Sequence, residues 1–364
     1  MSIRSVKVAA RQHGAMDDHP TERRRDGARE RKPTMADVAA RAGVSRALVS
    51  LVFRGRPGAS AATRERVFSA ADDLGYRPDT AARLLARGRS RTLGVMLTVH
   101  QPFHADLVEA IYPAAEQVGY EVLLSASAPV RDETKAVEAL LSHRCEGLIL
   151  LGSQADARWL DELGRRTATT VVGRRLPGTH VDSVHTADAL GIRQAVDHLV
   201  ELGHRAITHI DGGQAPAAAD RRRAYRAAMR AHDLAEHVDV LRGNHTEDAG
   251  IEAGHTLLTR GALPTAVLAG NDRCAIGLIG TFLRAGVDVP GEVSVVGYDD
   301  SHISHLVHDL TTVSQDALRM GEHAVRSVVR RLDDDSLDPE EIVLEPKLVV
   351  RNTSAPPRDG RTAP

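Results

Sequence analysis

The chain has 364 residues, and its contents of 26% charged and 42% apolar residues are typical of a folded soluble protein. At roughly 100–200 residues per domain, this length predicts two or three domains. Two cysteines cannot build a disulfide framework, and no apolar run reaches the roughly 18 residues that a membrane span needs. Residues 1–32 also lack the apolar stretch of a secretory signal, so we expect a cytoplasmic protein without membrane contacts.

The formal net charge of −2 hides an asymmetry along the chain. Residues 1–90 hold 19 Lys and Arg against 10 Asp and Glu, a net charge of +9, whereas the remainder holds 28 against 39, a net charge of −11. A basic front on an acidic body suggests a polyanionic partner for the front end only. Residues 1–32 are polar and lack apolar periodicity, and we expect them to be a disordered tail.

Residues 33–78 are predicted to form a helical DNA-binding domain. Ala39, Gly43 and Val49 have the spacing of a helix-turn-helix, in which a small residue lets two helices cross and a glycine makes the tight turn. Thr34, Ser45 and Ser60 are the expected N-caps of three helices, the second running from Arg46 to Phe53 and the third over 61–74. A generic helical hairpin would show the same three-position spacing.

A short fourth helical stretch follows in residues 79–86. Asp79 can cap it, and Ala82, Leu85 and Ala86 fall on one face at helical spacing. A helix of this length is not stable alone in water, so it could fold only when paired with a copy of itself, with DNA, or with both.

From Thr92 onward, short apolar runs alternate with amphipathic helical stretches, which indicates parallel sheets covered by helices on both faces. The number of elements favours two sheets. The predicted strands are 93–97, 122–124, 148–151, 170–172, 207–210, 266–268 and 293–296. The predicted helices are 105–118, 133–143, 190–202, 224–232, 250–259 and 275–285.

Three motifs in order, VSRALVS from Val44, SAATRERV from Ser60 and LGYRPDTAARLLA from Leu74, resemble the lactose-repressor (LacI/GalR) family of bacterial transcription regulators. The resemblance covers residues 33–352. It implies a helix-turn-helix domain, a hinge helix and linker at 79–91, and an α/β core of two doubly wound parallel-sheet lobes like a periplasmic binding protein. The expected N-lobe is about 92–187 and 316–340, the C-lobe about 188–315 and 341–352, and residues 353–364 a flexible tail.

The resemblance implies a set of DNA-binding positions on the second helix and around it. Arg46 could grip a guanine edge or only a phosphate. Leu85 is the expected wedge in the minor groove, supported by Ala82 and Ala86. The other implied positions are Thr34, Ser45, Ala47, Ser50, Leu51, Arg54, Arg64 and Tyr76.

The resemblance also implies an effector site between the lobes, where ligands bind beyond the carboxyl ends of the strands. Structural roles are open for three of its members: Asp272 could cap a helix, Asp299 could order its own turn, and Phe103 could be core. No metal or cofactor is expected, although His302, His305 and His308 are spaced by three. The implied ligand contacts are Gln101, Phe103, Arg174, Arg221, His245, Asp272 and Asp299.

Together these features predict a ligand-responsive DNA-binding regulator. We expect a repressor that binds a pseudo-palindromic operator as a homodimer, with a sugar as effector. Nucleotide-binding and hydrolase motifs are missing from the sequence, so an enzyme is not expected. Two alternatives stay open: a solute-binding protein for transport, and a DNA-binding protein whose body is a constitutive dimerisation scaffold.

Overall fold

The computed structural model describes residues 33–77, 89–306 and 309–358, and its contacts divide the chain into two units that meet at residues 83 and 84. We call the described part of the first unit the head (33–77) and that of the second unit the body (89–358 without 307–308). The tail expected at 1–32 and most of the hinge expected at 79–91 lie outside the described residues.

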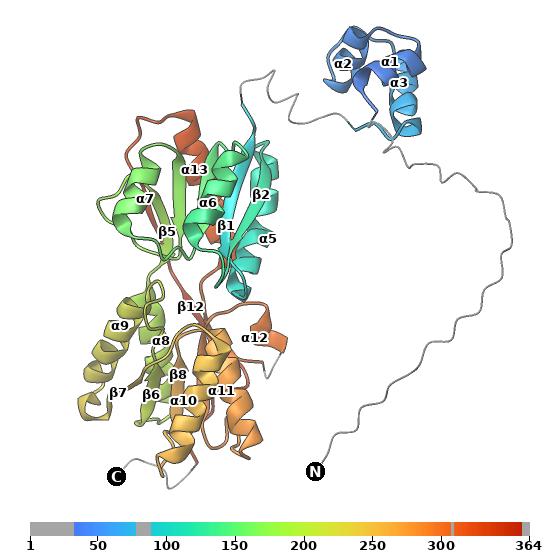
Figure 1. The fold of residues 1–364 in the computed structure, drawn as a ribbon. Helices are drawn as coiled ribbons and strands as arrows, with labels where there is room; N and C mark the ends of the chain where they lie inside the picture. The colour runs from blue at the N-terminus through green and yellow to red at the C-terminus, as the bar shows by residue number, and fades with distance from the viewer. Residues whose placement is uncertain (1–32, 78–88, 307–308, 359–364) are drawn as a thin grey trace, which may run out of the picture. The chain divides into compact units, whose positions relative to one another are not determined.

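Three helices form the head: α1 (Met35–Ala42), α2 (Arg46–Phe53) and α3 (Ala61–Asp73) (Figure 1). Thr34, Ser45 and Ser60 each accept a hydrogen bond from the backbone N–H three residues further on, so all three predicted caps are confirmed. Gly43 has a φ of 64°, the left-handed conformation that the predicted turn requires.

The head buries a small core of its own. Val38 and Ala39 of α1 meet Val49 and Val52 of α2, and α3 closes the cluster with Val67, Ala70 and Ala71. The predicted contact of Ala39 with the second helix therefore has its physical basis in a shared apolar core. Since each helix has only 8 to 13 residues, this tertiary burial is what makes the helices stable.

The N-lobe of the body is a six-stranded parallel sheet with the order β11-β5-β4-β3-β1-β2. Its strands and helices follow the predicted alternation (Figure 1). They are β1 (Thr92–Thr98), α5 (Pro102–Gln117), β2 (Glu121–Ser127), α6 (Glu133–Ser142), β3 (Gly147–Leu151), α7 (Ala157–Gly164), β4 (Ala168–Val172), β5 (Asp182–Thr186), α13 (Ala317–Asp333) and β11 (Glu341–Leu344).

The C-lobe repeats this plan with the strand order β12-β10-β9-β8-β6-β7. All neighbours are parallel except β12, which pairs antiparallel with β10 at the edge. Its elements are α8 (Asp188–Glu201), β6 (Ile207–Ile210), α9 (Ala218–Ala231), the 3-10 turn η1 (Ala235–His237), β7 (Asp239–Leu241), α10 (Glu247–Thr259), β8 (Ala266–Ala269), α11 (Asp272–Arg284), β9 (Ser294–Asp299), α12 (Ile303–Leu306), β10 (Thr311–Ser314) and β12 (Lys347–Val349).

The chain crosses between the lobes three times, after β5, after β10 and after β11. The third crossing corrects the expected boundary at 340/341, because β11 pairs with β5 of the N-lobe and the chain leaves that lobe only after Leu344. The prediction of a flexible tail from residue 353 onward is also wrong at the beginning of that segment. Thr353 is buried and its backbone carbonyl accepts a hydrogen bond from Val295, while the carbonyl of Ala355 accepts one from His204.

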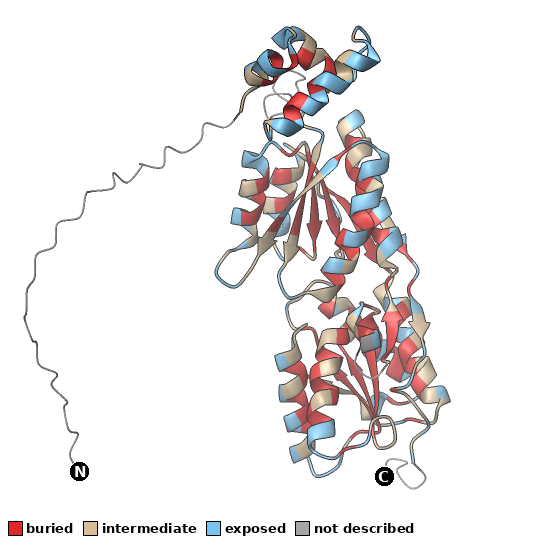
Figure 2. Cartoon of the chain, turned by 90° about the vertical axis from the view of Figure 1, so that its right-hand side faces the viewer, coloured by how far each residue is buried: buried red, intermediate tan, exposed pale blue. Residues whose placement is uncertain are grey.

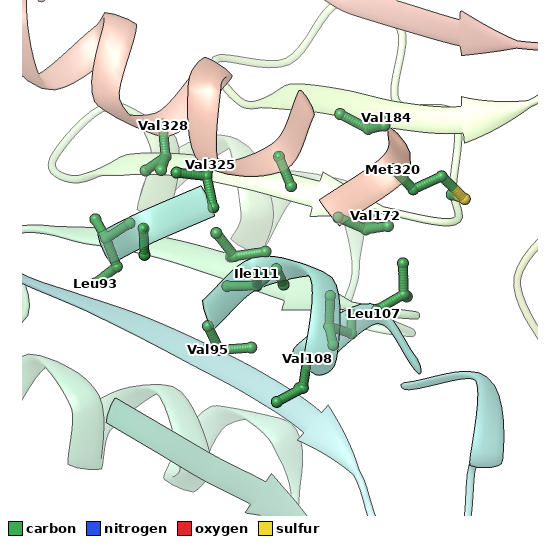
Figure 3. Close-up of a cluster of buried hydrophobic side chains, with 14 of the residues drawn as sticks. Leu93, Val95, Leu107, Val108, Ile111, Val172, Val184, Met320, Val325 and Val328 are labelled. Carbon is green, nitrogen blue, oxygen red and sulfur yellow. The ribbon is translucent and has the colours of Figure 1, made fainter. Parts of the chain in front are cut away.

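The central strands of both sheets are buried, the edge strands β2, β11 and β12 are partly exposed, and the covering helices expose their outer faces (Figure 2). In the N-lobe, α5 and α13 pack over the sheet with Leu107, Ile111 and Met320 in one apolar cluster (Figure 3). A Cβ at Gly321 of α13 would lie 2.6 Å from the Cβ of Ala110, so glycine is required for this close approach. None of the helices in the described ranges has both the length and the apolarity to cross a membrane.

A buried ion pair fastens α13 to the sheet below it. Asp182, at the start of β5, is fully buried. Its carboxylate accepts hydrogen bonds from Nε of Arg331 at 3.1 Å and from Nη2 at 2.7 Å, and the N–H of Glu340 adds a third at 2.7 Å. This pair joins β5, after which the chain first leaves the N-lobe, to α13, with which the chain returns to it. Two charged groups that share two parallel hydrogen bonds form a strong contact.

Candidate DNA-binding surface and effector site

The start of α2 presents the exposed side chains that the resemblance implies. Ser45, Arg46 and Ala47 are exposed, and Ser50 and Leu51 are partly so. Within the described residues, the Arg46 guanidinium has neither a hydrogen bond nor an ion pair. In a helix-turn-helix, the N-terminal residues of the second helix reach the base edges. Arg46 is therefore exposed at the position from which such a helix contacts DNA.

Other predicted DNA-binding side chains in the head also make contacts within it. Arg54 donates from Nε to the carbonyl of Ser50 at 3.0 Å and from Nη2 to its hydroxyl at 2.5 Å. Arg64 donates to the carbonyl of Arg56 at 2.5 Å. Tyr76 lies against Phe53 with the ring centroids 5.8 Å apart. Thr34 caps α1, as described above. Ala82, Leu85 and Ala86 lie outside the described residues, so the minor-groove wedge stays a prediction.

A cavity of about 680 Å³ lies between the lobes. Its N-lobe wall comes from the loops after β3 and β4 and from the end of β5, and its C-lobe wall comes from the start of α8 and from α9 with the loop before it. Of the seven predicted ligand contacts, only Arg174 lines this cavity. The polar lining residues are Ser153, Gln154, Arg174, Arg175, His185, Thr186, Asp188, Gln214, Asp220 and Arg223.

Arg221 lies behind this wall, buried in the C-lobe. Its Nε is 2.7 Å from the carboxylate of Asp188, its Nη1 donates to the carbonyl of Gly270 at 3.0 Å, and its guanidinium lies 3.6 Å from the ring centroid of Tyr298. Burial by itself lowers the pKa of Arg221, but Asp188 and the other surrounding groups outweigh this effect and raise it. Arg221 therefore does not line the cavity itself but holds Asp188, which does.

A hydrogen-bond chain joins the ends of the two sheets beside Arg221. Thr186, at the end of β5, donates to Oε1 of Gln315 at 2.8 Å, and Nε2 of Gln315 donates to Asp299 at 2.7 Å. Asp299 also lies 4.0 Å from Nη1 of Arg221. Burial raises the pKa of Asp299 to about 7, against the lowering effect of Arg221. Gln315, at the second crossing, thus links Thr186 at the first crossing to Asp299 at the end of β9, so Asp299 contacts groups beyond its own turn.

Asp272 is fully buried away from the cavity and joins the loop after β9 to strand β10 of the C-lobe. Its carboxylate accepts hydrogen bonds from the backbone N–H of Ser301 at 2.8 Å, from the Ser301 hydroxyl at 2.9 Å and from the Thr312 hydroxyl at 2.5 Å. The cap of α11 is Asn271, so the expectation that Asp272 could cap this helix is wrong.

The remaining predicted contacts lie where the first helix of the N-lobe meets the C-lobe. Gln101 donates to the carbonyl of His245 at 3.4 Å and so bridges the lobes. Burial, followed by the charges of Arg221 and His209, lowers the pKa of His245 to about 3, and its Nε2 is buried without a hydrogen-bond partner among the described residues. Phe103 packs in the N-lobe core beside Leu107, in agreement with the core alternative.

Sequence reasoning missed a second contact between the lobes. Asp106 of α5 accepts hydrogen bonds from the backbone N–H of His302 at 3.0 Å and from its Nδ1 at 2.6 Å. It also missed Arg175 and Arg223 of the cavity, although Arg174-Arg175 and Arg221-Arg222-Arg223 stand out as arginine runs. Within the described ranges, no three His, Cys, Asp or Glu side chains are placed to hold a metal ion.

Family models match two parts of the chain. Residues 34–79 match the model of bacterial regulatory proteins of the lacI family, and residues 196–354 match a periplasmic binding protein-like domain. The HTH-type transcriptional regulator CelR of Thermobifida fusca is 33% identical over 340 residues, which cover 89% of this chain and 99% of that protein. A solved CelR–cellobiose complex is 31% identical with a TM-score of 0.64, and covers 88% of this chain and 100% of its own.

Two further solved structures are similar. A LacI transcriptional regulator from a Rhodococcus species is 48% identical, with a TM-score of 0.70, over 73% of this chain and 98% of its own. The lac repressor dimer bound to operator and the anti-inducer ONPF is 28% identical, with a TM-score of 0.76, over 89% of this chain and 100% of its own. The helix-turn-helix head, the two-lobed body and these matches show that the chain belongs to the LacI family of bacterial transcriptional regulators.

Proposed function

We propose that this regulator is a repressor that binds a pseudo-palindromic operator as a homodimer in the cytoplasm, and that a small molecule in the cavity between the lobes controls its affinity for DNA. The observation that carries the proposal is the cavity, because both lobes contribute polar side chains to the lining of a single space of about 680 Å³. A cavity of this size suits a small metabolite.

The geometry supports a route from ligand to DNA. The two walls of the cavity belong to different lobes, which three short crossings join. A ligand that contacts both walls therefore favours one angle between the lobes. Such a ligand changes DNA affinity only if DNA binding favours a different angle. In a homodimer, two copies of α2 would meet two half-sites of the operator, as in other helix-turn-helix dimers.

A sugar is the proposed effector. The similar CelR protein is solved with cellobiose, and hydroxyl groups are well matched by the carboxylate, amide and guanidinium groups around the cavity. The scaffold alternative predicts instead that no small molecule changes DNA binding. The transport alternative has no use for a DNA-binding head.

The test begins with selection of bound sequences from random duplexes. The full chain is then titrated onto the selected duplex while candidate metabolites are added. We expect an inverted-repeat site, two chains per duplex, and at least one compound that changes the DNA affinity. A DNA affinity that no compound alters would favour the scaffold alternative, and one chain per duplex would overturn the dimer.

A cavity-filling variant locates the response. Ala227 of α9 lines the cavity, so Ala227→Trp should abolish the effector response and leave DNA binding without effector unchanged. Ala231→Trp on the same helix is the matched control, because Ala231 is exposed and outside the cavity wall. An unchanged response in Ala227→Trp would place the effector elsewhere.

A further inference from the structure

The cavity wall has an unusual composition for a neutral sugar. Seven of its 18 lining residues are alanine, and none is Phe, Tyr or Trp. An aromatic ring is the side chain that offers a flat apolar surface to the C–H face of a sugar ring, and ligand cavities are commonly rich in such rings. Affinity in this cavity must therefore come mainly from polar and charged contacts.

Both carboxylates of the wall already have cationic partners. Asp188 is held by Arg221 at 2.7 Å, in a pair whose two side chains are almost fully buried. Asp220 is paired with Arg223 one turn along α9. A ligand hydroxyl would have to share these carboxylates with the arginines, so the wall offers no unpaired negative charge.

Arg174 is the cation of the wall that is not neutralised. Its Nη1 donates to the carbonyls of Ala155 at 2.7 Å and Ser153 at 3.4 Å, and within the described residues no carboxylate lies within ion-pair distance. These two carbonyls fix the direction of the guanidinium but carry no formal charge. Since Arg174 is only partly buried, its remaining donors are available to a ligand in the cavity.

A second arginine of the wall is held only loosely. Arg175 pairs with Glu341 at 2.9 Å, with the arginine side chain 62% exposed, and Glu341 is shared with His185 at 3.0 Å. An exposed pair of this kind contributes little to stability, so Arg175 can turn toward an anion at low cost.

Resting on the proposed function, we propose that the effector is an anionic sugar, whose carboxylate or phosphate is bound by Arg174 with Arg175 at the rim. Guanidinium groups bind both anions through paired N–H donors. Carboxylates and phosphates share this chemistry, and the experiment below separates them.

Isothermal titration calorimetry on the full chain tests the proposal with matched probes. The neutral probes are glucose, galactose, mannose and xylose. Each is compared with its aldonate and with its terminal phosphate, and the three hexoses are also compared with their uronates. We expect at least one acid to bind at least about tenfold more tightly than its neutral parent, as one charge-assisted hydrogen bond allows. Tight binding of the aldonates or uronates assigns a carboxylate, and tight binding of the terminal phosphates assigns a phosphate.

Arg174→Gln should lower the affinity for that acid by about tenfold to a hundredfold and leave the affinity for the neutral parent sugars unchanged. Arg205→Gln is the matched control, because Arg205 also donates to two backbone carbonyls but does not line the cavity. Thermal unfolding of both variants shows whether the fold is kept. Arg174→Lys keeps the charge and should restore part of the affinity, which a purely structural role would not predict.

The inference is wrong if no acid binds more tightly than its neutral parent, or if Arg174→Gln leaves the affinity for the acid unchanged. If a neutral sugar releases DNA, this inference fails and the proposed function stands. If no compound of any class changes the DNA affinity, the proposed function fails.

Discussion

The head and the body place their charged side chains in opposite environments. In the head, Arg46 is exposed and unpaired within the described residues, ready to meet a large surface from outside. In the body, Arg221 is buried between carboxylates, and Asp182 is fully buried against Arg331. A charge that must contact a polyanion can stay in water until binding, whereas a charge inside the protein must be compensated because desolvation is costly. The difference teaches that the exposed Arg46 of the head is free to pair with a partner from outside, whereas the buried charges of the body are paired within the fold.

The largest expected effect comes from breaking a buried pair. Asp182→Ala leaves Arg331 buried without its carboxylate and should lower the free energy of unfolding by about 3–5 kcal/mol. The chain has one tryptophan, Trp159 on α7, so urea unfolding followed by fluorescence reports on the N-lobe. Glu162→Ala, which breaks the exposed Arg158–Glu162 pair in the same lobe, should change little. Equal effects of the two variants would contradict the contrast between buried and exposed pairs.

Acid should destabilise the body through its buried neutral histidines. Burial lowers the pKa of His104 to about 4, and its Nδ1 would have to give up the hydrogen bond that it accepts from the N–H of Thr98 in order to take a proton. Below about pH 6.5, His104 is therefore protonated in the unfolded chain but stays neutral in the folded chain. The free energy of unfolding falls as the pH drops from there toward 4, by about 3 kcal/mol at most for this residue. His104→Gln should reduce this fall, measured by urea unfolding at pH 7.5 and 5. The exposed His143→Gln is the control, and an unchanged pH dependence in His104→Gln would count against the idea.

In the head, removal of one free charge should affect recognition and not stability. Arg46→Ala should cost about 1–3 kcal/mol of DNA affinity and relax the preference at one operator position. Binding to duplexes changed at each position measures this. Arg66→Ala, an exposed arginine on α3, controls for the loss of charge. A loss that is uniform over all duplexes would make Arg46 a phosphate contact.

The smallest effect is expected at the partly exposed pair between the lobes, Asp106 and His302. His302 has a side chain that is 52% exposed, so Asp106→Asn should change the free energy of unfolding by less than about 1 kcal/mol. It should nevertheless broaden the distance distribution between fluorophores on Glu138 of α6 and Glu252 of α10. Glu109→Gln, on the same helix, should not. Identical distributions in both variants would show that this contact does not restrain the lobes.

The sequence predicts the head almost completely because its signals are local. Each cap lies three residues from the N–H that it binds, and Gly43 makes its turn with its own φ. The long apolar strands of the body, such as β1 and β3, were also predictable. The strand β5 was not, since four of its five residues are polar although all five are buried, and β11 was missed although three of its four residues are apolar.

The lining of the cavity proposed as the effector site was predicted least well, because it depends on contacts between distant segments. Arg221 meets Asp188, 33 residues earlier, and Asp272 meets Thr312, 40 residues later. No local pattern shows whether a carboxylate faces a cavity or a neighbouring loop. Family resemblance placed Arg221 and Asp299 near the cavity, but only Arg174 lies on its wall.

The three crossings also affect the order in which the chain can fold during synthesis. The head has its own core and is complete once its last helix leaves the ribosome. The N-lobe lacks α13 and β11 until residue 344 has emerged, and the C-lobe lacks β12 and the anchor at Thr353. A ribosome that stops before these segments therefore releases a DNA-binding unit with its own core attached to two unfinished lobes, and residues 317–353 complete both lobes.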